Sequence, residues 1–192
     1  MRFILSTTAL VLATVSVTAA AQSTAGATHA KSAHKSTDQA LIANALSAAP
    51  ASVAAGATVA GHDGRILRKG STDWVCMPDM PDVPNNSPMC LDAPWRAFID
   101  ALMNKKTPTV TQIGFGYMLQ RDMPVSNTDP FATAPTSSNQ WIQDGGPHVM
   151  ILLPDQRMME NMSTDPKSGG PFVMWKGTPY AHVMVPAVPV RK

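Results

Sequence analysis

The residues Gly-Gly-Pro-His-Val-Met at 145–150 return as Gly-Gly-Pro-Phe-Val-Met at 169–174 and, in a looser variant, as Pro-Tyr-Ala-His-Val-Met at 179–184. Each copy places two or three β-favouring residues directly after proline or glycine, a pattern typical of a strand that begins at a turn. The intervals between the copies differ, so they do not predict a solenoid repeat. We expect three short strands in the last third of the chain.

The preceding residues add further strands and two helices. Apolar residues at helical spacing from about residue 37 predict a helix that stops at Pro50. Asp92 is placed as the N-cap of a second helix, with Pro94 in its first turn. Gly114 and Gly116 lie in an expected strand, where glycine often marks the close approach of a ligand or another backbone. Strands are expected at 57–60, 66–68, 74–76 and 113–119, and a short helix at 155–162.

These elements predict an α+β fold, in which an antiparallel sheet packs against two helices and one disulfide is present. Cys76 and Cys90 are the only cysteines of the chain. The prolines and the Asn85-Asn86 pair between them exclude regular structure, so a bond between the cysteines would close a loop. In the chain-entropy model this closure stabilises the fold by roughly 3 kcal/mol.

Residues 1–21 have the features of a cleaved signal peptide, with Arg2 before an apolar run and Ala19-Ala20-Ala21 at the expected cleavage site. Residues 22–36 are mostly small and polar and are expected to form a disordered leader, followed by a single α+β domain at 37–192. The mature protein is therefore expected in the periplasm or outside the cell, with no membrane anchor after cleavage. The formal net charge of +2 is small, so we expect no nucleic-acid partner.

A face of the expected sheet carries residues that suit a soft metal ion. Because side chains alternate along a strand, His148 and Met150 share one face, as do His182 and Met184. Imidazole and thioether groups suit copper, especially Cu(I), so these four residues are the first candidate ligands for copper or a small ligand. The second candidates are Met77, Met80 and Met89. The alternative interpretation is that the methionines fill the core and the histidines bond to neighbouring groups.

A hydrolase is a second hypothesis, because Ser126 and Asp129 in a long loop, with His148 or His182, supply the residue types of a nucleophile, base and orienting acid. The chain has no Gly-x-Ser-x-Gly motif. The binding loop would consist of Ser126, Asn127 and Asp129. The alternative interpretation of these residues is that they only form turns.

A third hypothesis is a structural or interaction module of the cell envelope. Trp141 lies in a predicted loop, where its ring is placed to stack on a sugar or a peptide. The pattern of the other tryptophans indicates core positions. The sequence leaves the oligomeric state open.

Five stretches together resemble an uncharacterised family of small exported bacterial proteins. The resemblance covers roughly residues 45–187 and rests on short motifs. It implies a bacterial, periplasmic protein and implies no activity. The stretches contain Cys-Met-Pro-Asp at 76–79, Pro-Met-Cys-Leu-Asp at 88–92, Ser-Asn-Thr-Asp-Pro-Phe-Ala at 126–132, Gly-Pro-His-Val-Met-Ile at 146–151 and Gly-Thr-Pro-Tyr-Ala-His-Val-Met-Val-Pro at 177–186.

Overall fold

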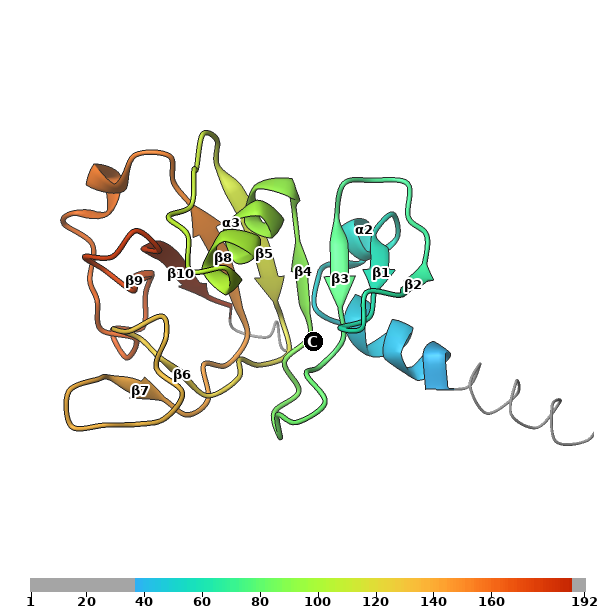
Figure 1. Ribbon diagram of the computed structural model, residues 1–192, viewed down its shortest axis with the longest axis horizontal. Helices are drawn as coiled ribbons and strands as arrows, with labels where there is room; N and C mark the ends of the chain where they lie inside the picture. Colours follow the sequence, from blue (N-terminus) through green and yellow to red (C-terminus); the bar gives the residue numbers. More distant parts are fainter. Residues whose placement is uncertain (1–36, 188–192) are drawn as a thin grey trace, which may run out of the picture. The chain divides into compact units, whose positions relative to one another are not determined.

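The computed structural model describes residues 37–187, whose arrangement is shown in Figure 1. The predicted signal peptide at 1–21 and the predicted leader at 22–36 lie outside the described residues, as do residues 188–192. Among the described residues, no helix combines the length and the apolar character needed to cross a membrane.

Most strands form one eight-stranded sheet in the order β2-β1-β3-β4-β5-β8-β10-β9. Neighbouring strands are antiparallel except for the parallel pair β1 and β3. The strands of this sheet are β1 (Thr58–Ala60), β2 (Ile66–Arg68), β3 (Val75–Met77), β4 (Met89–Leu91), β5 (Gly114–Met118), β8 (His148–Leu152), β9 (Phe172–Met174) and β10 (His182–Pro186). A separate antiparallel pair joins β6 (Val125–Ser126) to β7 (Trp141–Ile142). The predicted α+β class is confirmed.

The helices begin and end largely where local sequence signals place them. The first helix covers residues 37–46. It ends before Pro50, as expected, and Pro50 is the N-cap residue of the one-turn helix α2 (Ala51–Ala54). In α3 (Ala93–Met103), the Asp92 side chain accepts a hydrogen bond from the Trp95 amide at 2.9 Å, as a capping residue should. Its other oxygen accepts from the Phe115 amide at 2.6 Å, so the same cap ties α3 to β5.

The short helix expected at 155–162 is a 3₁₀ turn, η1 (Gln156–Met159). The Asp155 side chain caps it by accepting a hydrogen bond from the Arg157 amide at 3.0 Å. Met159 is buried against Val173 and Val183 on one face of the sheet. One turn is therefore enough to cover the end of the sheet at β9 and β10.

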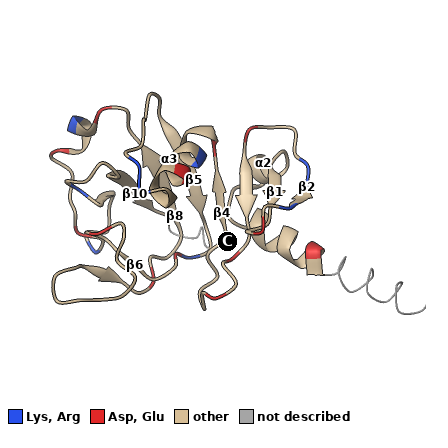
Figure 2. Cartoon of the chain, in the orientation of Figure 1, with Lys and Arg blue, Asp and Glu red and all other residues tan. Residues whose placement is uncertain are grey.

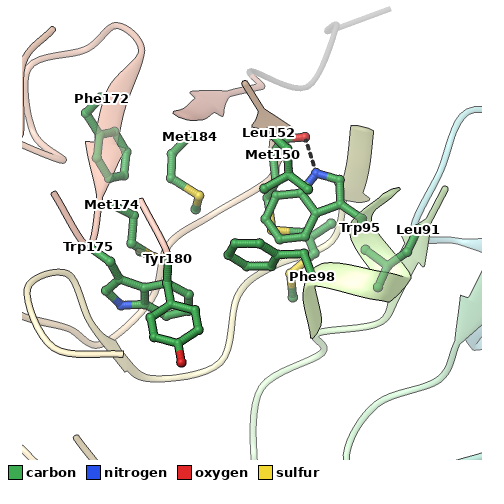
Figure 3. Packing of buried hydrophobic residues seen from close by; sticks show 11 residues of the cluster. Leu91, Trp95, Phe98, Met150, Leu152, Phe172, Met174, Trp175, Tyr180 and Met184 are labelled. Carbon is green, nitrogen blue, oxygen red and sulfur yellow. Dashed lines mark hydrogen bonds between the residues drawn. The ribbon is translucent and has the colours of Figure 1, made fainter. Parts of the chain in front are cut away.

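Helix α3 covers the opposite face and supplies the centre of the largest core cluster, shown in Figure 3. Trp95 and Phe98 meet edge to face, with ring centroids 4.9 Å apart. The indole N–H of Trp95 donates a hydrogen bond to the Met150 carbonyl at 3.2 Å, which satisfies a buried donor and fixes the helix on β8. The cluster consists of Leu91, Trp95, Phe98, Met118, Met150, Leu152, Phe172, Met174, Trp175, Tyr180 and Met184.

The two glycines of β5 explain how α3 can lie so close to the sheet. A β-carbon at Gly114 would come within 2.9 Å of the Pro94 Cβ, and one at Gly116 within 2.8 Å of the Met150 Cε. Both distances are shorter than real β-carbon contacts. The close approach predicted for these glycines is therefore made by the start of α3 and by a core methionine.

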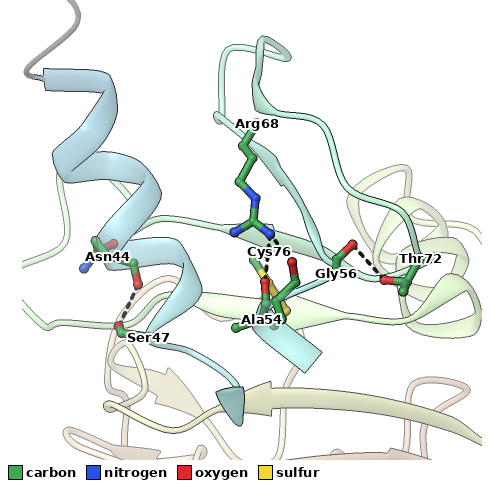
Figure 4. Close-up of a disulfide and its surroundings, with 9 residues drawn as sticks. Asn44, Ser47, Ala54, Gly56, Arg68, Thr72 and Cys76 are labelled. Atoms are coloured by element: carbon green, nitrogen blue, oxygen red, sulfur yellow. Dashed lines mark hydrogen bonds between the residues drawn. A yellow bond between two sulfur atoms is a disulfide. The ribbon is translucent and has the colours of Figure 1, made fainter. Parts of the chain in front are cut away.

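The predicted disulfide between Cys76 and Cys90 is present, and the two residues lie directly opposite each other on β3 and β4. Both are fully buried on the face covered by the first helix and α2. Figure 4 shows Arg68 beside the disulfide, donating a hydrogen bond to the Ala54 carbonyl at the end of α2 at 3.2 Å. The buried neighbours of the disulfide are Ala45, Ala48, Ala49, Ala57 and Val59.

Candidate functional site

The strand register decides how the predicted metal ligands lie. Met184 pairs with Met150, while His148 pairs with Pro186 at one end of β10 and His182 pairs with Met174 near the other end. All of these side chains share the face that α3 covers. Met150 and Met184 belong to the core cluster, which leaves their sulfur atoms among apolar and aromatic groups.

His182 is enclosed by aromatic rings. Its ring centroid lies 5.1 Å from that of Trp95, 5.0 Å from that of Trp175 and 6.0 Å from that of Phe98. Its Nδ1 donates a hydrogen bond to the Tyr180 carbonyl at 3.1 Å. Burial lowers the pKa of His182 to about 4, so the imidazole is neutral at pH 7 and belongs to the core.

The three methionines near the disulfide do not join the strand histidines. Met77 and Met89 are paired across β3 and β4 and pack against the core, and Met80 lies exposed in the loop between them. Among residues 37–187, no group of three or more histidine, cysteine, aspartate or glutamate side chains is placed to hold a metal ion. The predicted ligand set is therefore spread over different parts of the fold.

His148 has a different environment from His182. It is 1 % exposed, and its Nδ1 lies 2.8 Å from the Gly146 carbonyl. A carbonyl only accepts, so Nδ1 carries the proton of the neutral ring and Nε2 presents a lone pair. Nε2 is buried without a hydrogen-bond partner, and the nearest carboxylate oxygen, Oδ2 of Asp122, is 3.9 Å away. This distance is too long for a direct hydrogen bond.

Asp122 is the second buried polar group of the site. It is 7 % exposed, and its Oδ1 accepts a hydrogen bond from the Met123 amide at 2.8 Å. Burial raises the pKa of the Asp122 carboxyl, and the His148 imidazole opposes the shift. Gly145 lies against this side chain, since a β-carbon there would be 2.8 Å from the Asp122 Cβ. No local pattern in the sequence marks Asp122, because only the pairing of β5 with β8 brings it beside His148.

Both side chains line a cavity of about 530 Å³. Its apolar wall includes Trp141 and Ile142 from β7 and Phe172, Met184 and Pro186 from the sheet. Its polar lining consists of Gln140, Gln143, Asp122, Asp144, His148 and Lys167. Apolar and polar side chains line the cavity in comparable numbers, and small-molecule sites likewise combine apolar surface with converging polar groups.

Charges near the cavity are mixed. Asp144 forms an ion pair with Arg121 at 2.8 Å, so the guanidinium is directed to Asp144. Figure 2 shows acidic and basic residues interspersed along the described chain. The electrostatic character of the cavity is therefore set by the groups that line it, above all by Asp122 and His148.

Ser126, Asn127 and Asp129 lie in a hydrogen-bonded turn. The Ser126 hydroxyl oxygen accepts from the amides of Thr128 at 3.2 Å and Asp129 at 3.0 Å, and the Asp129 carboxylate accepts from the Phe131 amide at 2.9 Å. In the part of the chain that the structure describes, no hydrogen bond joins Ser126 to a histidine. This is the chemistry of an ST turn followed by an Asx turn.

Asn127 connects this turn to two other segments. Its side-chain N–H group donates to Oε1 of Gln140 at 2.6 Å and to the Thr164 carbonyl at 2.9 Å. The Ser126 carbonyl accepts a hydrogen bond from the Trp175 indole at 2.7 Å. These bonds position β6 and β7, and through Trp141 and Ile142 they shape one wall of the cavity.

Comparison of the chain with models of protein families, with curated proteins and with solved structures found no match. The resemblance to a family of exported bacterial proteins stays a prediction.

Changing Asp122 to asparagine is expected to stabilise the protein. Burial disfavours the ionised form of the Asp122 carboxyl, whereas the amide of Asp122→Asn carries no charge and offers a donor to Nε2 of His148. We expect the free energy of unfolding to rise by about 1 kcal/mol, measured by urea denaturation. The exposed Asp82, changed to asparagine, is the matched control and should have little effect. A less stable Asp122→Asn variant would contradict this description of the pair.

Proposed function

We propose that the protein is an exported ligand-binding protein that holds a small molecule in the cavity beside His148. The observation that carries the proposal is the buried Nε2 of His148, which has no hydrogen-bond partner although a carboxylate lies 3.9 Å away. Leaving a buried polar atom unpaired costs about 1–3 kcal/mol. A ligand that donates a hydrogen bond to Nε2 would remove this cost.

The rest of the cavity supports the same conclusion. Trp141, Ile142 and Phe172 offer an apolar surface for the body of a ligand, while His148 and Asp122 offer directed polar contacts. Small-molecule sites combine burial of apolar area with a few placed polar groups in this way. Buried positions at which a polar atom is left unpaired are often sites of function.

Export is supported by two features of the chain. Residues 1–21 carry the charge, apolar run and small residues of a signal peptide. The buried Cys76–Cys90 disulfide fits an oxidising compartment. We propose the periplasm or the cell exterior as the location.

Three probes of one shape test the binding function: 2-phenylethylamine, 2-phenylethanol and 3-phenylpropionate. Each has an aromatic body for the apolar wall and a different polar end. We expect at least one to bind, and we expect His148→Phe to weaken that binding by about tenfold or more, the effect of losing one buried polar contact. Calorimetric titration measures the affinities.

The same substitution at another histidine, His62→Phe, is the matched control. His62 lies in an exposed turn and bonds to the Pro78 carbonyl at 2.8 Å, away from the cavity. Trp141→Ala is a second test that does not touch the Asp122–His148 pair. Binding that survives both His148→Phe and Trp141→Ala would mean that the ligand lies elsewhere.

Copper is a second candidate ligand, because His148 and Met184 line the same cavity. A Cu(I) competition titration tests it. If copper binds there, Met184→Leu should weaken binding by about tenfold or more, since leucine keeps the volume and removes the sulfur. Met150→Leu is the matched control, because Met150 lies opposite Met184 on the same sheet face. Equal affinities of the two variants would exclude Met184 as a ligand.

A further inference from the structure

We infer that the cavity binds a ligand whose polar end is a primary ammonium group and whose body is apolar. The inference rests on the proposed function and names the class of molecule that the site would take. It is carried by the two acceptors, Nε2 of His148 and Oδ2 of Asp122, which lie 3.9 Å apart and share no hydrogen bond.

The directions of the hydrogen bonds around His148 and Asp122 favour a ligand that donates twice. The Nδ1 proton of His148 is committed to the Gly146 carbonyl at 2.8 Å, so in the neutral ring Nε2 is the acceptor. Oδ1 of Asp122 already accepts from the Met123 amide, which leaves Oδ2 as an acceptor toward His148. A ligand that satisfies both atoms must therefore donate twice from one position. An ammonium nitrogen carries three N–H bonds and can do so, whereas a hydroxyl carries one O–H bond.

The charge of the buried Asp122 carboxyl favours a cationic ligand. The Asp122 carboxyl is buried, burial disfavours its charged form, and Nε2 of His148 lies 3.9 Å from Oδ2, too far for a direct hydrogen bond. The guanidinium of Arg121 is paired with Asp144 at 2.8 Å, and Asp144 adds to the negative potential at Asp122. A buried charge without a counter-charge is costly, so a cation at Oδ2 is strongly favoured over a neutral group.

Lys167 is the feature of the cavity that favours a negatively charged ligand. It is exposed and lines the same cavity, so it could attract an anionic end of a ligand. An exposed lysine is well solvated and contributes little, while a contact with the buried carboxylate is made at low dielectric. The contact at Asp122 should therefore decide the choice of ligand.

The apolar wall of the cavity favours a ligand with an apolar body. Trp141, Phe172 and Met184 all line the same cavity. Aromatic faces attract cations as well as apolar groups, so this wall suits an aromatic or aliphatic amine. A small inorganic cation would leave the wall without a partner.

The three probes introduced above test this inference by their order of affinity. We expect 2-phenylethylamine to bind about tenfold or more tightly than 2-phenylethanol, and 3-phenylpropionate to bind most weakly. In Asp122→Asn the affinity for the amine should fall to that for the alcohol, and in Asp82→Asn it should not change. Asp122→Asn is expected to be stable, so a loss of affinity would not reflect unfolding.

Equal binding of amine and alcohol, or tightest binding of the acid, would overturn the ammonium assignment and leave the ligand-binding function standing. Preference for the amine that persists in Asp122→Asn would also overturn it. If none of the three probes binds to the wild-type protein, the proposed function fails together with the inference.

Discussion

Changing both Cys76 and Cys90 to alanine is expected to lower the free energy of unfolding by about 3 kcal/mol. The bond closes a loop between residues 14 apart and joins two strands at directly opposed positions. It also lies in a small cluster between the first helix and the sheet, in which four of the seven buried residues are alanines. Chemical denaturation of the oxidised protein and of the double variant measures the difference.

The wild-type protein with its disulfide reduced is the matched control, because it keeps both sulfur atoms and lacks only the bond. It should lose most of the same stability, whereas a reductant should leave the double alanine variant unchanged. A loss of less than about 1 kcal/mol in both comparisons would mean that the bond does not constrain the unfolded chain as the loop-closure model requires.

Lowering the pH from 7 to 5 is expected to cost about 2 kcal/mol of stability through His182 alone. Burial lowers the pKa of His182 to about 4 in the folded protein, from an ordinary value of 6.5. Between these two pKa values, His182 is protonated in the unfolded chain and neutral in the folded protein. This contribution to stability is fully present above pH 6.5 and is lost as the pH falls toward 4. Urea denaturation at several pH values measures it.

The variant His182→Leu should show a flatter dependence of stability on pH over this range, whatever its stability at pH 7. His62→Leu should keep the wild-type slope, because His62 lies in an exposed turn. Asp122 acts with the opposite sign, since burial raises its pKa and the folded protein binds its proton more readily. An unchanged slope in His182→Leu would contradict the description of His182 as a neutral core residue.

Local patterns were sufficient to predict most of the elements. Asp92 and Pro94 identified the start of α3, and the copies of the Gly-Pro-x-Val-Met pattern identified β8 and β9. These signals depend on residues that are near each other in the chain. The α+β class followed from them, and the pairing of Cys76 with Cys90 followed from the cysteine count.

The site required information that no local pattern carries. The separation of His148 from His182 depends on the register between β8 and β10, and the position of Asp122 depends on the pairing of β5 with β8. Methionine has the same side chain in a core as at a metal ion, so the sequence could not distinguish the two uses of Met150 and Met184.

The most direct test of the central claim is a nuclear magnetic resonance titration that follows the ring nitrogens of the histidines. The protein is titrated with 2-phenylethylamine, 2-phenylethanol and 3-phenylpropionate in turn. We predict that at least one probe shifts the Nε2 signal of His148 in a saturable way, while the signals of His62 and His182 stay in place. A His148 signal that no probe moves, or an equal response from His62, His148 and His182, would contradict a binding site at this cavity.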